Sequence, residues 1–118
     1  MLAVRPEISV VVPVFNEREC LAEMCERCSA ALALTGRRWE LVFVDDGSTD
    51  GSSDLLCQFA REGAGIHVVQ LSRNFGHQAA LTAGLAASRG AGVILIDGDL
   101  QDPPELIPAL VINQARSK

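Results

Sequence analysis

Residues 8–17 read Ile8-Ser9-Val10-Val11-Val12-Pro13-Val14-Phe15-Asn16-Glu17. The run from Ile8 to Val14 is short, rich in valine and bounded by polar residues, which is typical of a strand buried inside a sheet. A stretch with helical character, Glu17 to Leu34, begins where this run ends. A buried strand that leads directly into a helix predicts a parallel sheet, because parallel strands are joined by crossover segments that are usually helical.

The same alternation continues along the chain. Three more apolar runs are expected to be buried parallel strands, namely Leu41 to Val44, Ile66 to Leu71 and Val93 to Ile96. Helical stretches follow them at Ser53 to Arg61, Gln78 to Ser88 and Pro104 to Gln114. This order predicts one α/β unit over residues 1–118, with a Rossmann-like parallel sheet, helices on both faces and right-handed crossovers.

The last expected strand, Val93 to Ile96, is apolar throughout. Such a strand normally has partners on both sides, because an exposed apolar edge pairs with other chains. We therefore expect the fold to continue beyond Lys118. The chain alone is expected to be marginally stable and prone to associate.

Composition excludes several classes of function. The chain carries 15 Asp and Glu against 10 Lys and Arg, a net charge of −5. No stripe of basic side chains could neutralise phosphates, so nucleic acid is not an expected partner. The sequence also lacks the 18 or more consecutive apolar residues of a membrane span and has no signal-type apolar stretch near Met1, so a cytoplasmic location is expected.

Three of the four cysteines fall in the first helical stretch. One interpretation is a redox motif or half of a zinc site, because Cys25 and Cys28 have the C-x-x-C spacing, although no second pair accompanies them. The other is a buried helix face. Residues suited to such a face recur there every three or four positions: Leu21, Met24, Cys25, Cys28 and Leu32. This periodicity favours cysteines in the core.

Each expected strand is followed by a distinctive polar loop. In an open parallel sheet, ligands bind outside the carboxyl ends of the strands, so these loops should converge on one cleft. In chain order they are Pro13-Val14-Phe15-Asn16-Glu17, Asp45-Asp46-Gly47-Ser48, Ser72-Arg73-Asn74-Phe75-Gly76 and Asp97-Gly98-Asp99-Leu100-Gln101. The first loop contains no glycine, which excludes the G-x-G-x-x-G turn of dinucleotide oxidoreductases.

The fourth loop is a candidate metal site. If the chain stays extended beyond Ile96, the side chains of Asp97, Asp99 and Gln101 point to the same side, because side chains alternate along a strand. Two neighbouring carboxylates repel each other unless a cation lies between them, and ligands that are all oxygen favour Mg²⁺ or Mn²⁺. The alternative is a solvated turn in which Asp99 or Asp102 caps the next helix.

The second loop contains acids with two different explanations. Asp45 and Asp46 come directly after a strand, where a carboxylate can accept a hydrogen bond from an N–H group of a nucleobase. In the structural alternative, Gly47 makes a turn and Asp50 or Ser48 caps the following helix. That alternative accounts for one acid and leaves the two at the strand end unexplained.

Other side chains of these loops also have two interpretations. Phe15 either lines the cleft or belongs to the core. Arg73 either holds a diphosphate through two hydrogen bonds or forms a salt bridge in solvent. Asn74 and Gly76 precede a helix whose N-terminus attracts anions. His77 is a single histidine at a helix start, and we do not expect it to be catalytic.

With these loops in order at strand ends, the sequence resembles the inverting glycosyltransferases of the GT-A fold. That family includes dolichol-phosphate mannosyltransferases and bacterial polyprenyl-phosphate glycosyltransferases. The resemblance spans Ile8 to about Leu110 and rests on the motifs of residues 12–17, 44–51, 73–76 and 97–105. Phe15 stands where a tyrosine is frequent in the family, and Gly98 stands where an alanine is frequent. The chain is thus similar to the nucleotide-diphospho-sugar-binding half of such an enzyme.

The resemblance implies roles for individual residues. The residues that would contact a UDP- or GDP-linked sugar are Pro13, Phe15, Glu17, Val44, Asp46, Arg73 and Gly98. The first five of these would surround the nucleoside. Asp97, Asp99 and Gln101 would hold Mg²⁺ or Mn²⁺ on the diphosphate, and Asp99 would be the catalytic residue among them.

The resemblance also implies an acceptor and a setting. The sugar would pass, with inversion, to a polyprenyl (dolichyl or undecaprenyl) phosphate in cell wall or glycolipid biosynthesis. Family members continue with an acceptor side and often with C-terminal membrane helices. Residues 1–118 are therefore expected to be the N-terminal donor-binding part of a protein associated with the cytoplasmic face of a membrane. The competing hypothesis is a truncated, noncatalytic nucleotide-binding fragment or pseudoenzyme.

Overall fold

The computed structural model describes residues 5–97 and 100–116. Four parallel strands form one sheet in the order β3-β2-β1-β4, with β1 at Ile8–Val14, β2 at Trp39–Asp45, β3 at Ile66–Gln70 and β4 at Gly92–Leu95. The helices are α1 (Arg18–Ala33), α2 (Ser52–Glu62), α3 (His77–Ala87), the short 3-10 helix η1 (Pro104–Leu106) and α4 (Ile107–Arg116). The predicted α/β fold with a Rossmann-like parallel sheet is confirmed.

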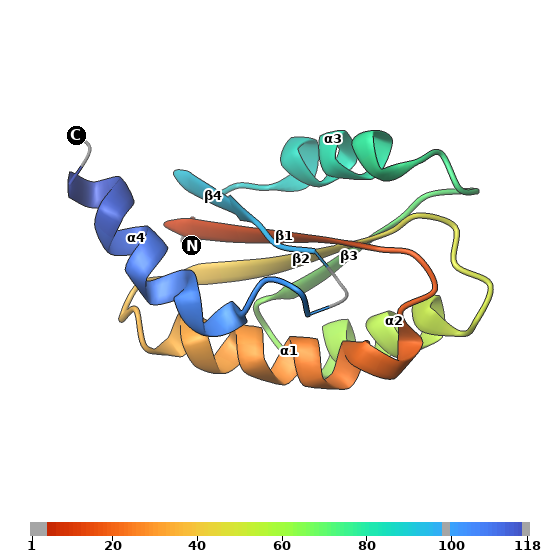
Figure 1. Ribbon diagram of the computed structural model, residues 1–118, viewed down its shortest axis with the longest axis horizontal. Helices are drawn as coiled ribbons and strands as arrows, with labels where there is room; N and C mark the ends of the chain where they lie inside the picture. The colour runs from red at the N-terminus through yellow and green to blue at the C-terminus, as the bar shows by residue number, and fades with distance from the viewer. Residues whose placement is uncertain (1–4, 98–99, 117–118) are drawn as a thin grey trace, which may run out of the picture.

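Helices cover both faces of the sheet (Figure 1). α1, α2 and α4 lie on one face, and α3 lies on the other. Strands are added outward from β1 to β3, and the direction then reverses to place β4 beside β1. Because the helix changes face where the direction reverses, the crossovers share one hand and a topological switch point lies between β1 and β4.

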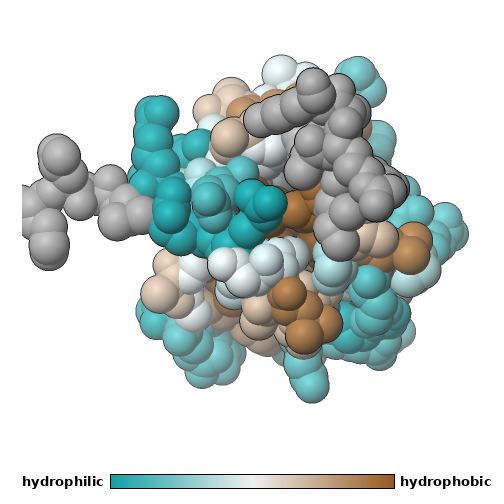
Figure 2. Space-filling view, turned by 90° about the vertical axis from the view of Figure 1, so that its left-hand side faces the viewer, coloured by the Kyte–Doolittle hydropathy of each residue, from teal (hydrophilic) through white to brown (hydrophobic). Residues whose placement is uncertain are grey.

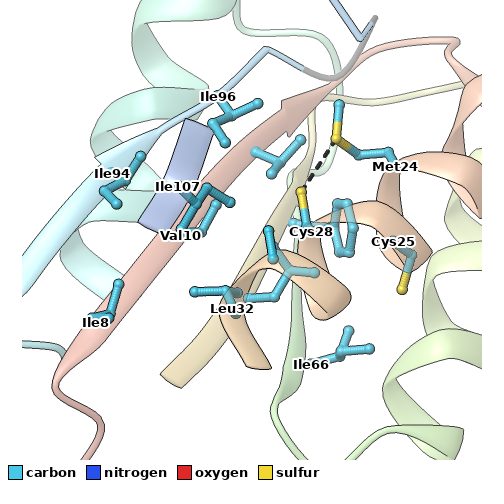
Figure 3. Close-up of a cluster of buried hydrophobic side chains, with 14 of the residues drawn as sticks. Ile8, Val10, Met24, Cys25, Cys28, Leu32, Ile66, Ile94, Ile96 and Ile107 are labelled. Atoms are coloured by element: carbon cyan, nitrogen blue, oxygen red, sulfur yellow. Dashed lines mark hydrogen bonds between the residues drawn. The ribbon is translucent and has the colours of Figure 1, made fainter. Parts of the chain in front are cut away.

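The larger core lies between the sheet and α1. This helix buries the apolar face predicted from its periodicity, and Cys28 Sγ lies 3.4 Å from Met24 Sδ (Figure 3). Burial raises the pKa of the Cys28 thiol to about 12, so the thiol stays protonated and unreactive. Within residues 5–97 and 100–116, no three His, Cys, Asp or Glu side chains group as metal ligands. The prediction that Cys25 and Cys28 are core residues is confirmed.

α3 packs closely on the sheet because its inner face is made of small residues. Ala80 is fully buried there, and a Cβ atom on Gly84 would lie 2.3 Å from Val11 Cγ1 and 2.9 Å from Val44 Cγ2. A larger residue at position 84 would push the helix outward. The close approach brings the first residue of α3, His77, to the carboxyl ends of the strands.

The two outer strands are only partly buried, which corrects the expectation of four fully buried strands. In β3 only Ile66 is buried, and in β4 the side chain of Leu95 is 46% exposed. β1 and β2 each pair with a strand on both sides, whereas β3 and β4 pair on one side within the described chain. The side chains of the outer strands therefore have a neighbouring strand on one side only and stay more exposed than those of β1 and β2.

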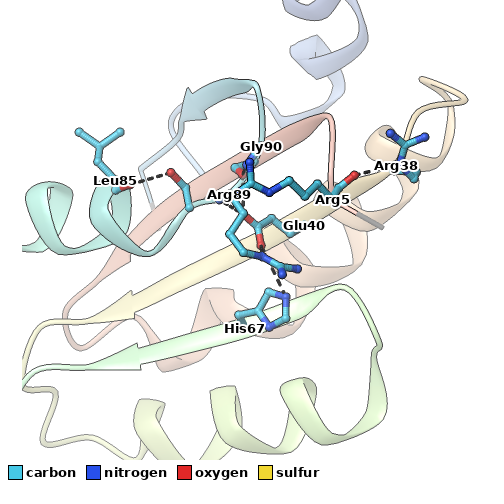
Figure 4. A network of polar contacts seen from close by, with 9 residues as sticks. Arg5, Arg38, Glu40, His67, Leu85, Arg89 and Gly90 are labelled. Carbon is cyan, nitrogen blue, oxygen red and sulfur yellow. Dashed lines mark hydrogen bonds and ion pairs between the residues drawn. The ribbon is translucent and has the colours of Figure 1, made fainter. Parts of the chain in front are cut away.

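β2 begins two residues earlier than predicted and contains a buried acidic side chain, Glu40 (Figure 4). Its Oε2 accepts hydrogen bonds from the Ser9 hydroxyl (2.5 Å) and the Arg89 N–H (2.6 Å), and its Oε1 lies 3.6 Å from His67 Nε2. The Ser9 hydroxyl in turn accepts the Gly90 N–H at 2.7 Å. These bonds fasten the turn between α3 and β4 to the middle of the sheet.

The end of the molecule at which the strands begin has a basic cleft. Seen from that end, hydrophilic side chains lie around much of the surface and a smaller group of hydrophobic ones lies near its middle (Figure 2). Arg37, Arg38 and Arg89 line a cleft of about 410 Å³ there, with His67 and the buried Glu40. In the described part of the chain, no helix combines the length and apolar character needed to cross a membrane.

Candidate active site

An open cleft of about 460 Å³ lies at the opposite end, outside the carboxyl ends of β1 and β4. Its walls come from the loops after all four strands and from the start of α3. It is lined by Pro13, Val14, Phe15, Glu17, Asp46, Asn74, Gly76, His77, Ala80 and Asp97. The predicted convergence of the loops on one cleft is confirmed, and the cleft lies at the topological switch point, where open parallel sheets bind ligands.

The first two loops hold each other through Asn16. Its backbone N–H donates to Ser48 Oγ (2.9 Å), and its Oδ1 accepts the Thr49 N–H (2.8 Å). Asn16 has a φ of +52°, a left-handed conformation that asparagine tolerates better than most residues. This conformation turns the chain sharply after β1, so that Phe15 and Glu17 both border the cleft.

The second and third loops touch at Gly47. This residue has a φ of +75°, and a Cβ atom there would lie 2.4 Å from both Arg73 C and Asn74 N. A side chain is therefore excluded both by the backbone conformation and by the neighbouring backbone. The absence of a side chain at Gly47 allows the loop that carries Arg73 and Asn74 to pack against the end of β2.

Asp46 joins the end of β2 to the start of α3. Its side chain is buried, its Oδ1 accepts the Phe75 N–H (2.8 Å) and its Oδ2 accepts the Gly76 N–H (3.1 Å). The carboxylate thus satisfies two backbone N–H groups just before α3, where an outside anion was expected to bind. Asp46 also lines the cleft, so the same residue that orders the loop lies on the wall a ligand would meet.

The other acids of the second loop have structural roles. Asp45 Oδ1 accepts the Ser48 N–H at 3.1 Å and so closes the turn. Asp50 accepts hydrogen bonds from the N–H and hydroxyl of Ser52 at the start of α2, and from the Arg18 N–H at the start of α1. These bonds hold the pKa of Asp50 below its usual value. Of the two residues predicted to cap the helix after this loop, Asp50 and Ser48, it is Asp50 that accepts hydrogen bonds at the start of α2.

Phe15 lines the cleft, whereas Arg73 and Phe75 lie outside its lining. The Arg73 guanidinium carbon lies 4.6 Å from the centre of the Phe75 ring, a cation–π contact, and no carboxylate among the described residues pairs with it. Arg73 lines a neighbouring cleft that shares Phe15 and Asn74 with the first. Phe15 is 43% exposed, so it is a surface residue of the cleft and not a core residue.

Asp97 stands at the end of β4, on the opposite wall from Asp46. The Ile96 N–H donates to the Val11 carbonyl at 3.0 Å, which keeps the chain beside β1 up to this point. The Asp97 side chain is half exposed, and its Oδ1 lies 3.9 Å from His77 Nε2. The sequence placed His77 at a helix start but could not predict its contact with Asp97, which lies 20 positions further along the chain.

The structure tests only part of the proposed metal motif. Gly98 and Asp99 lie outside the described residues. Gln101 is exposed, but Leu100 has a φ of +65° and β4 ends at Leu95. The chain is therefore not one extended segment from Asp97 to Gln101, and strand alternation does not place these two side chains on one face. This corrects the geometric argument made from the sequence.

Val44 occupies a different environment from the other residues expected at the nucleoside. Pro13, Phe15, Glu17 and Asp46 all line the cleft. Val44 is fully buried beneath α3, in a cluster with Val11, Val42 and Ala80. Its side chain does not reach the cleft.

The sequence matches a known family along most of its length. The model of the family described as "Glycosyl transferase family 2" matches residues 9–116. The chain belongs to this family. Its fold is similar to that of glucosyl-3-phosphoglycerate synthase from Mycobacterium tuberculosis in complex with Mn²⁺, UDP and glucosyl-3-phosphoglycerate, with a TM-score of 0.71 and 29% identity over 92% of this chain and 39% of that one. The match confirms the GT-A type of fold.

Two relatives of this family 2 chain are named for their action on polyprenyl phosphates. An undecaprenyl-phosphate 4-deoxy-4-formamido-L-arabinose transferase from Pseudomonas paraeruginosa is 49% identical over 110 residues, which cover 92% of this chain and 32% of the relative. A dodecaprenyl-phosphate galacturonate synthase from Rhizobium johnstonii is 44% identical over 111 residues, which cover 93% and 33%. The family 2 chain therefore spans about a third of the length of these relatives.

Proposed function

We propose that this chain is the donor-binding part of a glycosyltransferase that transfers a sugar from a nucleoside diphosphate to a polyprenyl phosphate. The observation that carries the proposal is the cleft at the switch point, which brings together Pro13, Phe15, Glu17, Asp46 and Asp97 from loops that are far apart in sequence. The two relatives that share 44% and 49% of their aligned residues with it support the polyprenyl phosphate acceptor.

The nucleoside is proposed to bind on the β1 and β2 side of the cleft. Phe15 offers an exposed ring, and the Asp46 carboxylate lies on the same wall. Because both oxygens of Asp46 already accept backbone N–H groups, a nucleobase would use a remaining lone pair. Val44 is expected to border the nucleoside through its backbone, since its side chain is buried under α3.

A divalent cation, Mg²⁺ or Mn²⁺, is proposed on the β4 side. Glu17, Asp46 and Asp97 make the cleft acidic, and an anionic diphosphate would be repelled there without a cation. The half-exposed carboxylate of Asp97 is an oxygen donor of the kind these ions prefer, and we propose that Asp99 and Gln101 complete the set. When bound, the cation would act as a Lewis acid on the departing diphosphate.

The proposed reaction is a direct displacement. An oxygen of the lipid phosphate attacks the anomeric carbon from the side opposite the nucleoside diphosphate, the bond to the diphosphate breaks, and the configuration inverts. A lipid phosphate is already anionic at neutral pH, so no residue is needed to take its proton. In this chain, the residues of the cleft bind and orient the donor, while Arg73 supplies positive charge to the diphosphate from the neighbouring cleft.

The 118-residue chain is expected to bind the donor and to transfer sugar negligibly, because the relatives are about three times longer. The acceptor side is proposed to belong to the remaining length. A transfer assay with radiolabelled donor and polyprenyl phosphate should give product only with a full-length protein of this kind. Robust transfer by the short chain would contradict this division, and a retained anomeric configuration would contradict direct displacement.

Calorimetry with UDP and GDP tests donor binding by the chain, with each nucleotide titrated in MnCl₂ and again in a chelator. We expect binding that depends on the metal and a large loss of affinity for Asp97→Asn. Asp54→Asn, an exposed acid in the first turn of α2, is the matched control and should bind normally. Equal affinity with and without the chelator would refute the metal, and no binding at all would refute the donor site.

A further inference from the structure

His77 is placed to meet a ligand in the cleft, although nothing in the proposed mechanism uses it. It is the first residue of α3, it lines the cleft, and its side chain is 61% exposed. Its Nε2 lies 3.9 Å from Oδ1 of Asp97, the carboxylate proposed to hold the cation. The imidazole therefore stands beside the proposed metal ligand.

The lining of the cleft contains few groups that can donate a hydrogen bond to an anion. The two backbone N–H groups before α3 already donate to Asp46, and Arg73, which is proposed to add positive charge to the diphosphate, lines the neighbouring cleft and not this one. Among the described side chains of the lining, the amide of Asn74 and the imidazole of His77 remain as donors. Of these two, His77 is the one with a contact to Asp97.

A diphosphate bound to the same cation as Asp97 would lie beside both Asp97 and His77. Two oxygens bound to the same Mg²⁺ lie within about 4.2 Å of each other, because each lies about 2.1 Å from the ion. A diphosphate oxygen that shared a cation with Asp97 would therefore lie close to the Asp97 carboxylate. His77 Nε2 lies 3.9 Å from the same carboxylate, so both the imidazole and such a diphosphate oxygen would be neighbours of Asp97.

We infer that the Nε2–H of His77 donates a hydrogen bond to the diphosphate of the donor. The inference rests on the proposed function and adds a substrate contact to it. Neutral imidazole is sufficient, because its Nε2–H donates as an amide N–H does. The contact makes His77 a specificity determinant that favours a nucleoside diphosphate over a nucleoside monophosphate.

Nucleotide affinities of His77 variants test this contact. In MgCl₂, His77→Ala should weaken UDP or GDP by about fivefold to tenfold, the effect of a partly exposed hydrogen bond to a charged group, and leave UMP or GMP unchanged. His77→Gln should recover most of the loss, because its amide donates a hydrogen bond. His67→Ala is the matched control, since His67 lies at the far end of the sheet. Equal losses for diphosphates and monophosphates would overturn the contact in favour of a structural role.

The imidazole NMR signals of the two histidines give a second readout that does not need activity. Addition of UDP or GDP with Mg²⁺ should shift the His77 Nε2 and ring proton signals and leave those of His67 in place. Nucleotide binding with unchanged His77 signals would overturn this inference alone. A wild-type chain that binds neither nucleotide would overturn both the inference and the proposed function.

Discussion

Asp46 shows how one residue can shape a site and also belong to it. Its two carboxylate oxygens accept the N–H groups of Phe75 and Gly76, and it lines the cleft. Removal of the side chain would leave two backbone N–H groups without their partner in a partly buried place. The order of the loop before α3 therefore depends on this carboxylate.

Asp46→Ala should lower the free energy of unfolding by about 2 kcal/mol or more, because each N–H left without a partner costs about 1 to 3 kcal/mol when it is buried. Urea denaturation measures the loss. Asp54→Ala, an exposed acid of α2, should change stability little and serves as the control. Equal effects of the two substitutions would contradict the structural role of Asp46.

Alanine substitutions of Gly47 and Gly36 would distinguish the cost of a strained backbone conformation from the cost of a steric clash. Both have positive φ, +75° and +68°, but a Cβ atom on Gly47 would meet the backbone of Arg73 whereas one on Gly36 would meet nothing within 4 Å. Gly36→Ala should cost about 1 kcal/mol from conformation alone. Gly47→Ala should cost clearly more in the same denaturation experiment and weaken nucleotide binding. Equal losses would show that the contact with the third loop is unimportant.

The residues of the cleft differ in how far the sequence could predict them. The strand-end positions of Asp46 and Asp97 were enough to mark them, because ligand sites in parallel sheets follow strand ends. The contact of His77 with Asp97 could not be predicted, since it exists only because β4 lies beside β1. The two bonds of Asp46 reach 29 and 30 positions along the chain, so local sequence could not reveal them.

Among the elements, η1 is fastened to α1 by an ion pair. Arg27 donates two hydrogen bonds to Glu105, from Nε at 2.7 Å and from Nη2 at 2.5 Å. These bonds lower the pKa of Glu105 from its ordinary 4.5 to about 2. Because the pKa is lower in the folded chain, the stabilisation is present above pH 4.5 and disappears as the pH falls toward 2.

Glu105→Gln should therefore lower the melting temperature at pH 7, and the difference from wild type should shrink as the pH falls toward 2, where the wild-type carboxyl becomes protonated. Both side chains are partly exposed, so the effect should be small and should shrink in high salt. Glu26→Gln, on the exposed side of α1, is the control. A pH-independent difference between Glu105→Gln and wild type would contradict the ion pair as its cause.

The ends of a strand could be predicted where neighbouring residues define them, and not where contacts with distant residues do. β1 was predicted with both of its ends, because apolar residues and polar neighbours define it. β2 was predicted too short, since Glu40 reads as a polar residue outside the strand although it is buried. Its partners Ser9 and Arg89 lie 31 and 49 positions away. The positive φ at Leu100 could not be predicted, because leucine rarely adopts this conformation and glycine is the usual signal for it.

At the scale of the whole molecule, β4 leaves an apolar edge. Leu95 on β4 is 46% exposed, and Leu106 and Leu110 of the adjoining η1 and α4 are 52% and 44% exposed. Such an edge pairs readily with other chains. The chain should therefore associate as its concentration rises, which sedimentation velocity measures.

Leu95→Lys should shift this association toward the monomer, because a charge on an edge strand disfavours pairing. Leu34→Lys is the control, since Leu34 is 80% exposed and stands at the end of α1, which is not an edge strand. A sharp monomer peak for the wild-type chain at every concentration would show that the edge does not drive association.

Paramagnetic broadening by Mn²⁺ tests the central claim most directly, because it locates the metal-bound nucleotide on the molecule. With UDP or GDP and a trace of Mn²⁺, the amide signals of Phe15, Asp46, His77 and Asp97 should broaden, and the same nucleotide with Mg²⁺ should leave them sharp. Signals at the opposite end of the sheet, such as that of Arg89, should stay sharp throughout. Broadening centred on the basic cleft around Arg89, or none that depends on the nucleotide, would contradict a donor site at the junction of β1 and β4.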